Sequence, residues 1–545
     1  MLKDYFEVPN KPAIKSGNIL SCDFTDHETF IPQPLDYSRG TIATYVDCNG
    51  LVKMSGVSDI ELITNGDFVT DSDWTKGTGT TISGGKANFT SATGVSLYQN
   101  IGTQSGIVKV TFSVTDYTSG ILNVYSGGNQ SVGTTNVQAN AIGQYTVYVD
   151  RSGGNNNIIF GSSGSNNFTG SIDNVSVKEV DVNTARIDYT TEIGKAKELQ
   201  KPSLLLEPQS TNLITFSDDF SQWTVDGEAS ISSDSIISPE GIQNSDKLIA
   251  GTTSGRQAIK FSISKTGNLA FSIFAKKGEY SVIQLSDARD GSAFANFNLD
   301  TGVVGNSNVY TASIVDMGNG WYRCKITWNA SFDILAVRVG IVTTPTSARV
   351  ENFAGNGSDG LYIYGAQLEQ QSYATSYIPT SGSTVTRNQD LANNAGQLGV
   401  FNNEEGVLYA EMASLANSGV QRKLSISDGT NQKVVVLQFT DVNNQLRSFL
   451  YNGALQVNTY NVLSKALEFN KIAFKFKQDD FSLYVNGSEV ATDSSGTTFS
   501  TGDLTQFNFN DGGISDPFHA RIREIKVFRR ALTDSELQEL TNNIV

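Results

Sequence analysis

Most of the chain consists of short runs in which apolar and polar residues alternate, and these runs are separated by Gly, Asn and Asp. In one such run, Ile472, Phe474 and Phe476 alternate with lysine and alanine residues. Alternation with a period of two places the apolar side chains on one face of a β-strand. The next apolar run ends in Asn486 and Gly487, a strong signal for a hairpin turn. The pattern predicts an all-β protein made of tandem jelly-roll β-sandwich domains.

A helical pattern is clear only near the C-terminus. Thr533 is followed three residues later by Glu536, which is the spacing of a capping box. Leu537 and Leu540 then provide an apolar stripe on one side of a helix. We therefore expect a short C-terminal helix after the last strand.

An internal repeat marks two of the sandwiches. The segment LITNGDF at 62–68, followed by Trp74, returns as LITFSDDF at 213–220, followed by Trp223. Each copy leads through alternating runs to a closing strand, and a polar stretch follows the second copy. The predicted organisation is an N-terminal segment at 1–60, a sandwich at 61–180, a segment at 181–210 that packs with 1–60, a second sandwich at 211–380, a linker at 381–403 and a third sandwich at 404–545.

Composition and charge exclude several classes of function. The 545 residues carry a formal net charge of −16, and so acidic a chain repels nucleic acids and anionic lipids. No apolar run approaches the roughly 18 residues of a transmembrane helix, so we expect no membrane insertion. The only histidines, His27 and His519, lie at opposite ends of the chain, which argues against a site with several histidine ligands. The three cysteines form no Cys-x-x-Cys pair, and the N-terminus has no signal-peptide pattern, so we expect synthesis in a reducing compartment.

Two of the predicted sandwiches resemble known families. The opening segment around 62–68 and the closing segment SIDNVSV at 171–177 are similar to those of jelly rolls of the carbohydrate-binding-module type. In the third sandwich, LYVNG at 483–487 and IREIKVFRRAL at 522–532 resemble motifs of the concanavalin A-like fold, which includes laminin G-like domains. Both resemblances imply lectin-like domains.

The middle of the chain is similar to structural proteins of bacteriophage virions, head or tail fibres among them. The resemblance covers residues 38–387 and is carried by separate motifs in the same order, namely TIATYVD at 41–47, LLLEPQSTNL at 204–213, GWYRC at 320–324, GAQLE at 365–369 and TSYIPT at 375–380. In that family the first two motifs lie closer together, so the sandwich at 61–180 resembles an insertion between them. The resemblance implies a virion protein, made in the host bacterial cytoplasm.

A virion appendage implies particular partners. We expect the N-terminal region to attach to other virion proteins of the capsid or tail, because its four prolines favour extended segments. Virion fibres are commonly trimers, and the alternation places Tyr310, Tyr362 and Tyr364 on outer faces, so we also expect a homo-oligomer, a trimer. The expected ligand is a glycan on the host surface.

The candidate sugar-binding residues lie on the strand that follows the Asn319-Gly320 turn. Alternation places Trp321, Arg323 and Lys325 on the face opposite Tyr322, Cys324, Ile326 and Trp328. An indole ring beside two cations suits a sugar with acidic substituents. The alternative is that a neighbouring domain or subunit covers this face. Trp74 and Trp223 are also candidates for stacking on sugars, with core packing as the alternative.

A structural calcium ion is the one cofactor that the resemblance implies. The residues that would hold it are Asp67 and Asp173, which open and close the first sandwich, and hard oxygen ligands suit Ca²⁺. Val69 and Arg523 stand where the related families carry acidic residues, which removes ligands. Solvated turn residues are the alternative interpretation of both aspartates.

No catalytic motif is recognisable, and we expect a protein that is not an enzyme. Glycoside hydrolysis needs two carboxylates facing each other across a cleft, and no spaced pair of this kind stands out. The leading hypothesis is a head or tail fibre that binds host glycans. A purely structural decoration or spacer protein and a glycan depolymerase are the two alternatives.

Overall fold

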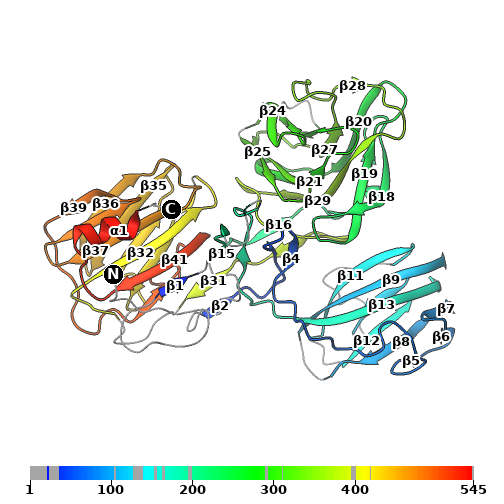
Figure 1. Cartoon of the computed structure of the whole chain (residues 1–545), viewed down its shortest axis with the longest axis horizontal. Helices are drawn as coiled ribbons and strands as arrows, with labels where there is room; N and C mark the ends of the chain where they lie inside the picture. Colours follow the sequence, from blue (N-terminus) through cyan, green and yellow to red (C-terminus); the bar gives the residue numbers. More distant parts are fainter. Residues whose placement is uncertain are drawn as a thin grey trace.

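The structure, a computed structural model, contains three β-sandwiches grouped around a central connecting region (Figure 1). It describes residues 21–23, 36–102, 106–126, 139–151, 156–162, 166–193, 195, 199–288, 293–309, 311–393, 401–417 and 419–542. These residues form antiparallel sheets and one short α-helix, which confirms the predicted all-β fold of tandem jelly-roll sandwiches with a C-terminal helix. None of the described helices is long and apolar enough to cross a membrane.

The first sandwich packs a four-stranded sheet, in the order β10-β12-β8-β5, against a five-stranded sheet, in the order β11-β9-β13-β7-β6. Its strands are β5 (Thr75–Lys76), β6 (Thr80–Ile82), β7 (Ala87–Ala92), β8 (Gly94–Asn100), β9 (Ile107–Ser119), β10 (Asn123–Tyr125), β11 (Gly143–Asp150), β12 (Asn157–Ser162) and β13 (Phe168–Val180). On β9, Val108, Val110, Phe112 and Val114 are each at most 2% exposed. The alternation of the sequence therefore becomes the buried face of the sheet.

The second sandwich packs the order β17-β20-β27-β22-β23-β24, with β28 beside β20, against the order β18-β19-β29-β21-β26-β25. Its elements are the 3₁₀-helix η2 (Phe220–Gln222) and the strands β17 (Thr224–Val225), β18 (Ser230–Ile237), β19 (Gln243–Ile249), β20 (Gly255–Ser262), β21 (Gly267–Lys276), β22 (Val282–Asp287), β23 (Phe294–Asn298), β24 (Val303–Asn308), β25 (Thr311–Asp316), β26 (Trp321–Ala330), β27 (Ala336–Ile341), β28 (Asn352–Phe353) and β29 (Gly360–Glu369). Phe271 and Ile273 on β21 face the core between the sheets. Phe274 is also buried, but in a separate cluster on the outer face. The second sandwich is therefore covered on a face that an isolated domain would expose.

The third sandwich packs the order β14-β15-β41-β32-β37-β38-β39, with β1 beside β41, against the order β36-β35-β34-β33-β40. Its elements are β1 (Ser21–Asp23), β14 (Ile187–Asp188), β15 (Ser203–Leu205), β32 (Glu405–Ser414), β33 (Arg422–Ser427), β34 (Lys433–Phe439), β35 (Gln445–Asn452), β36 (Leu455–Val462), β37 (Asn470–Lys477), β38 (Phe481–Val485), β39 (Ser488–Asp493), β40 (Gln506–Asn508), β41 (Ala520–Phe528) and α1 (Asp534–Thr541). Helix α1 buries Leu537 against this sandwich. Three strands from before residue 210 thus extend a sheet whose other strands come after residue 404.

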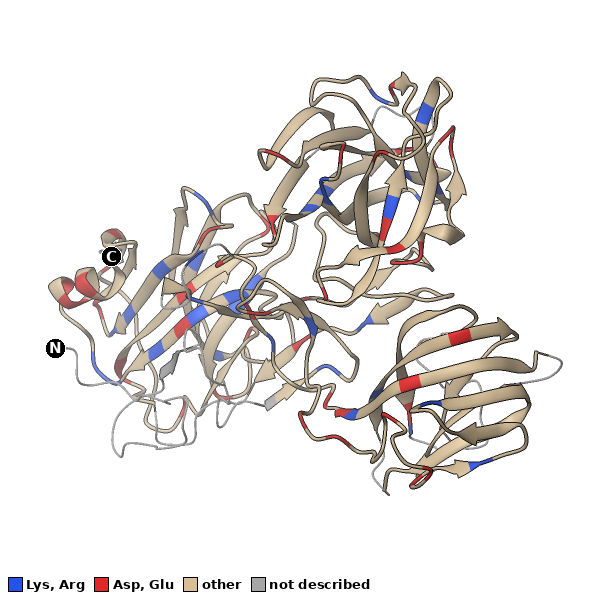
Figure 2. Ribbon diagram, turned by 45° about the vertical axis from the view of Figure 1, so that its right-hand side comes forward, with Lys and Arg blue, Asp and Glu red and all other residues tan. Residues whose placement is uncertain are grey.

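Three two-stranded pairs connect the sandwiches. They join β2 (Asp36–Ser38) to β31 (Leu391–Asn393), β3 (Thr44–Val46) to β4 (Val52–Met54), and β16 (Ser210–Asn212) to β30 (Val385–Arg387). We call the region formed by residues 36–58, 181–212 and 374–393 the hub. Figure 1 shows it where the three lobes meet, and Figure 2 shows basic and acidic residues interspersed on the ribbon around it.

The structure corrects the prediction of a linker at 381–403. Strands β30 and β31 lie within this range and pair with β16 and β2. Arg387 and Asp390 are at most 1% exposed. Arg387 and Asp390 pair with charged residues of other hub segments inside the protein, and the sequence alone shows no difference between such residues and solvated ones.

Candidate functional site

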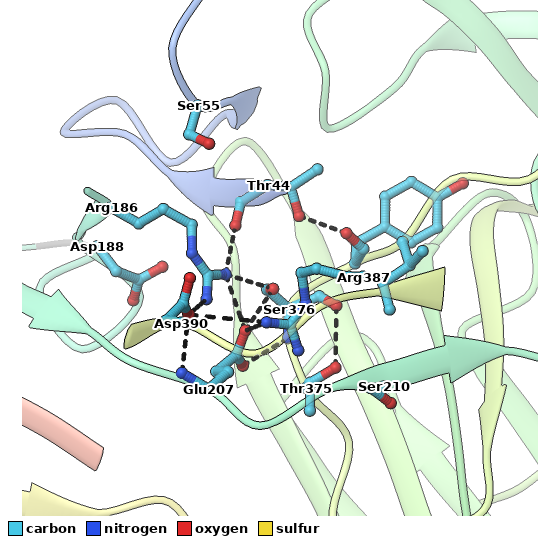
Figure 3. A network of polar contacts seen from close by, with 12 residues as sticks. Thr44, Ser55, Arg186, Asp188, Glu207, Ser210, Thr375, Ser376, Arg387 and Asp390 are labelled. Atoms are coloured by element: carbon cyan, nitrogen blue, oxygen red, sulfur yellow. Dashed lines mark hydrogen bonds and ion pairs between the residues drawn. The ribbon is translucent and has the colours of Figure 1, made fainter. Parts of the chain in front are cut away.

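A buried network of charged side chains holds the hub together (Figure 3). The Arg186 guanidinium donates from Nη1 to Glu207 Oε2 at 2.8 Å and to Ser376 Oγ at 2.7 Å. Its Nη2 donates to Asp390. Arg186 also reaches the carbonyl oxygen of Thr44 at 3.0 Å. One arginine therefore connects all three segments of the hub.

Two further arginines complete the network. Arg39 Nη1 lies 3.1 Å from Asp390 Oδ1. Arg387 Nη1 lies 3.4 Å from Glu207 Oε2 and 3.7 Å from Asp390 Oδ2. Burial alone would raise the pKa of Glu207, but Arg387 and Arg186 overcome it and hold this pKa well below its ordinary value. Both carboxylates therefore stay ionised and are occupied by partners within the hub.

A cavity of about 100 Å³ lies beside this network, at the junction of the hub with the second and third sandwiches. We call it the junction cavity. Thr44 and Asp188 line it from the hub, Arg323 and Lys325 from β26, and Arg521 from β41. The cavity thus collects side chains from segments that lie far apart in the sequence.

Arg323 and Lys325 line the junction cavity without a carboxylate partner. Arg323 Nη2 donates to Ser272 Oγ at 3.0 Å, its guanidinium lies 5.3 Å from the centre of the Phe274 ring, and its buried Nε has no hydrogen-bond partner. Burial, together with the neighbouring cations Arg323 and Arg521, lowers the pKa of Lys325 from 10.5 to about 7. Among the described residues, neither cation lies within 4.0 Å of an acidic oxygen.

The acidic residues of the cavity wall are engaged elsewhere. Asp188 accepts hydrogen bonds from the backbone N–H of Val46 and from the N–H and hydroxyl of Thr190, each at 3.1 Å. Arg521 Nη2 lies 3.5 Å from Asp188 Oδ1. Glu207 belongs to the network of the hub. The free hydrogen-bonding capacity in the cavity is therefore mainly that of cationic donors.

The structure corrects the prediction that Trp321 offers an indole face to a sugar. Trp321 is only 3% exposed, and it packs with Phe274, Tyr364 and Tyr377 in the cluster between the second sandwich and the hub. Its indole N–H donates to the carbonyl of Ile237 at 3.2 Å. The alternation itself is right, because Cys324 and Ile326 face the sandwich core, but the hub covers the opposite face.

The same cluster affects the argument for oligomerisation. Tyr364 has no exposed surface, so the expectation that it is exposed for contact with another copy is wrong. Tyr362 is half-buried and packs against the same cluster, with Lys247 Nζ 5.7 Å from its ring centre. Tyr310 lies outside the described residues.

Trp74 and Trp223 occupy equivalent core positions in the two repeats. They are 6% and 5% exposed, and each packs against the phenylalanine that precedes it, Phe68 or Phe220. The Trp74 indole donates to the carbonyl of Asn65, and that of Trp223 donates to the carbonyl of Phe216, both at 2.9 Å. The core interpretation of these two rings is therefore the correct one.

Asp67 and Asp173, the predicted calcium ligands, lie on neighbouring segments of the first sandwich. The N–H of Val175 donates to the carbonyl of Gly66 at 2.8 Å, which joins the two segments. Asp67 is exposed, and Asp173 accepts from the N–H of Asn174 at 2.7 Å. Within the described parts of the chain, no group of three or more His, Cys, Asp or Glu residues could hold a metal ion. Calcium binding stays a prediction.

The charged residues of the hub were not predicted from the sequence. The position of Glu207 could have indicated a buried ion pair. It ends the apolar run LLL at 204–206, and a charge in such a place is expected to have a buried partner. The positions of Arg186, Arg387 and Asp390 gave no such indication, since each stands in a polar stretch. Their partners lie up to 353 residues away, and only the folded chain brings them together.

Comparison with known proteins finds a family match within the third sandwich. Residues 412–538 match the concanavalin A-like lectin/glucanases superfamily, which confirms the concanavalin A-like domain predicted there. No curated protein matches the chain.

Similar solved structures include carbohydrate-binding and laminin domains. The CBM40 domain of the Ruminococcus gnavus IT-sialidase bound to α2,3-sialyllactose is 22% identical, with 28% of this chain and 94% of that chain covered and a TM-score of 0.24. The native heptameric SAP-like pentraxin from Limulus polyphemus is 14% identical, with 28% and 74% covered and a TM-score of 0.22. Domains LG4-5 of the mouse laminin α1 chain are 13% identical, with 52% and 90% covered and a TM-score of 0.20. TM-scores this low support no conclusion about function.

Proposed function

We propose that this protein is a structural component of a bacteriophage virion, a head or tail fibre that displays lectin-like domains to glycans on the host surface. The observation that carries the proposal is the match of residues 412–538 to a superfamily of lectins and glucanases. The assignment to a virion rests on the resemblance of residues 38–387 to phage structural proteins.

Three of the motifs that carry this resemblance meet in the hub and support a common role for it. The segments 41–47, 204–213 and 375–380 are linked by Arg186, by the hydrogen bond of Ser376 N–H to Glu207 at 2.8 Å, and by that of the Thr44 hydroxyl to the carbonyl of Tyr377. The fold thus brings these widely spaced segments together in one structural unit. In our proposal, this unit is the scaffold on which the fibre carries its sandwiches.

The outer face of the five-stranded sheet in the third sandwich is the surface that we propose for glycan binding. Tyr460 on β36 is 51% exposed and lies opposite Arg447 on β35. The Arg447 guanidinium lies 4.2 Å from the Phe449 ring centre and 5.5 Å from that of Tyr460, and its Nε donates to Asn458 Oδ1 at 2.7 Å. An aromatic ring beside fixed polar groups offers a sugar both a stacking surface and hydrogen bonds.

A shallow site of this kind gains strength from repetition. In the proposal, several copies act together as a homotrimer on the virion, because linked sites bind far more tightly than single ones. The N-terminal region attaches the fibre to other virion proteins. A chain lacking residues 1–20 should fold and bind glycans but should be missing from assembled particles.

Glycan binding is tested with a glycan array and the full chain. We expect the wild type to bind a subset of host-surface glycans and Tyr460→Ala to lose this binding. Leu467→Ala is the matched control, because Leu467 is 54% exposed and lies in the turn between β36 and β37, outside the sheet face. If Tyr460→Ala binds like the wild type, this surface is not the glycan site.

A purely structural spacer is the second candidate function. The observation that favours it is the buried network of charged residues, which holds the segments of the hub between the sandwiches together. A spacer without receptor binding would give a blank glycan array and would still be present in assembled particles.

A further inference from the structure

We propose that the junction cavity is a binding site for a small oxyanion, held by Arg323, Lys325 and Arg521. The ligand class comprises carboxylate, sulfate and phosphate groups, free or carried by a larger molecule. This site is separate from the sheet face proposed for glycans, and its existence does not depend on glycan binding there.

The first argument is the imbalance of charge in the cavity wall. Of the three cations, only Arg521 has a carboxylate of a described residue within 4.0 Å, the Asp188 side chain at 3.5 Å. Asp188 already accepts three shorter hydrogen bonds from Val46 and Thr190. A buried charge is costly unless it is paired, so the fold retains two cations whose counter-ion the described residues do not supply.

The second argument is the unused hydrogen-bonding capacity of Arg323. This residue is 92% buried, since only 8% of its surface is exposed, and its Nε has no partner. Ser272 Oγ occupies one position on Nη2, and the Phe274 ring lies against the guanidinium. The planar fork of an arginine matches two oxygens of a carboxylate, sulfate or phosphate group.

The third argument is the size and position of the cavity. Its volume of about 100 Å³ is enough for a group of several heavy atoms. Lys325 and Arg521 are only half-buried, so each keeps some surface in contact with solvent. In such a partly dehydrated site the attraction between an anion and these cations is stronger than in open water.

Lys325 makes the binding dependent on pH. The ionisable groups that face it are Arg323, Arg521, Asp188, Glu207 and the tyrosines Tyr45, Tyr373 and Tyr377. Burial raises the pKa of each of these tyrosines, so they stay neutral. Because the pKa of Lys325 is about 7, its charged fraction falls about tenfold between pH 6 and pH 8.

The test is isothermal titration of the full chain with sodium sulfate at constant ionic strength, because sulfate keeps its charge between pH 6 and pH 8. We expect saturable binding to one site at pH 6 and roughly tenfold weaker binding at pH 8. Lys325→Met should abolish most of the binding, and so should Arg521→Gln. Lys277→Met, an exposed lysine paired with Asp300 on the same sandwich, should bind sulfate like the wild type.

Further titrations identify the source of the oxyanion. Tighter binding of glucuronate than of sulfate, with none of glucose, would assign the site to an acidic sugar. Binding of sulfate and inorganic phosphate without glucuronate would assign it to free inorganic anions. The proposal is overturned if sulfate binds no better than chloride, or if both Lys325→Met and Arg521→Gln, folded as judged by an unchanged melting transition, bind sulfate like the wild type.

Discussion

Arg186 and Asp390 form an ion pair between positions 204 residues apart, and neither side chain has any exposed surface. Arg186 follows the first sandwich in the sequence, and Asp390 follows the second sandwich. Arg186 also pairs with Glu207, and Asp390 also pairs with Arg39. The arrangement of the three sandwiches around the hub therefore depends on contacts between segments that are far apart in the sequence.

Replacing Arg186 with methionine should destabilise the protein strongly. The change leaves the buried carboxylates of Glu207 and Asp390 undercompensated, and removal of one partner of a buried pair costs about 3–5 kcal/mol. Urea denaturation measures the free energy of unfolding. Lys465→Met is the control, because the Lys465–Glu468 pair is 67% and 65% exposed and contributes at most about 1 kcal/mol. Equal losses in the two variants would contradict the role assigned to the network.

The capping box of helix α1 should stabilise the C-terminal end of the third sandwich. Thr533 accepts a hydrogen bond from the N–H of Glu536, whose carboxylate accepts from the N–H of Thr533 and pairs with Arg530. Thr533→Ala should cost about 1 kcal/mol, while Thr533→Ser should keep most of the stability. Amide hydrogen exchange within α1 measures the difference. Equal protection in both variants would show that the cap contributes nothing.

The features that were predicted correctly from the sequence depend on residues close together in the chain. The alternation of Ile472, Phe474 and Phe476 identified the buried face of β37, and the spacing of Thr533 and Glu536 identified the capping box. The repeat also placed Trp74 and Trp223 at equivalent positions. These features follow from local periodicity and capping chemistry, which are visible in a single strand or helix.

The sequence could not predict which outer faces are covered. Trp321 was assigned to the correct face of β26, but no local pattern indicates that the hub packs against it. The buried Asp390 stands in a stretch rich in Asn and Thr and looks like part of a solvated linker. Contacts between segments hundreds of residues apart carry no local periodicity, and so the hub and the junction cavity were visible only in the structure.

His519 should make the protein less stable as the pH falls below 6.5. Burial lowers its pKa to about 4, and its buried Nε2 has no hydrogen-bond partner. The unfolded chain takes up a proton near pH 6.5, while the folded chain stays neutral at this residue down to about pH 4, so acid favours unfolding in this window. His519→Gln removes the effect. The free energy of unfolding of the variant, minus that of the wild type, should be about 2 kcal/mol larger at pH 4.5 than at pH 7. If the stability difference between the variant and the wild type is the same at both pH values, the lowered pKa of His519 is contradicted.

Trp321→Ala should reduce stability and leave glycan binding intact. The ring is buried between the second sandwich and the hub, and removal of a buried tryptophan costs about 3–5 kcal/mol. The variant also leaves the carbonyl of Ile237 without the indole donor. Ile514→Ala is the control, because Ile514 is 94% exposed and its loss should change the free energy of unfolding by less than about 0.5 kcal/mol. Denaturation measures the first effect, and the glycan array measures the second at a temperature where the variant is folded. Lost glycan binding at full stability would instead place Trp321 in a sugar site, against the burial that the structure gives it.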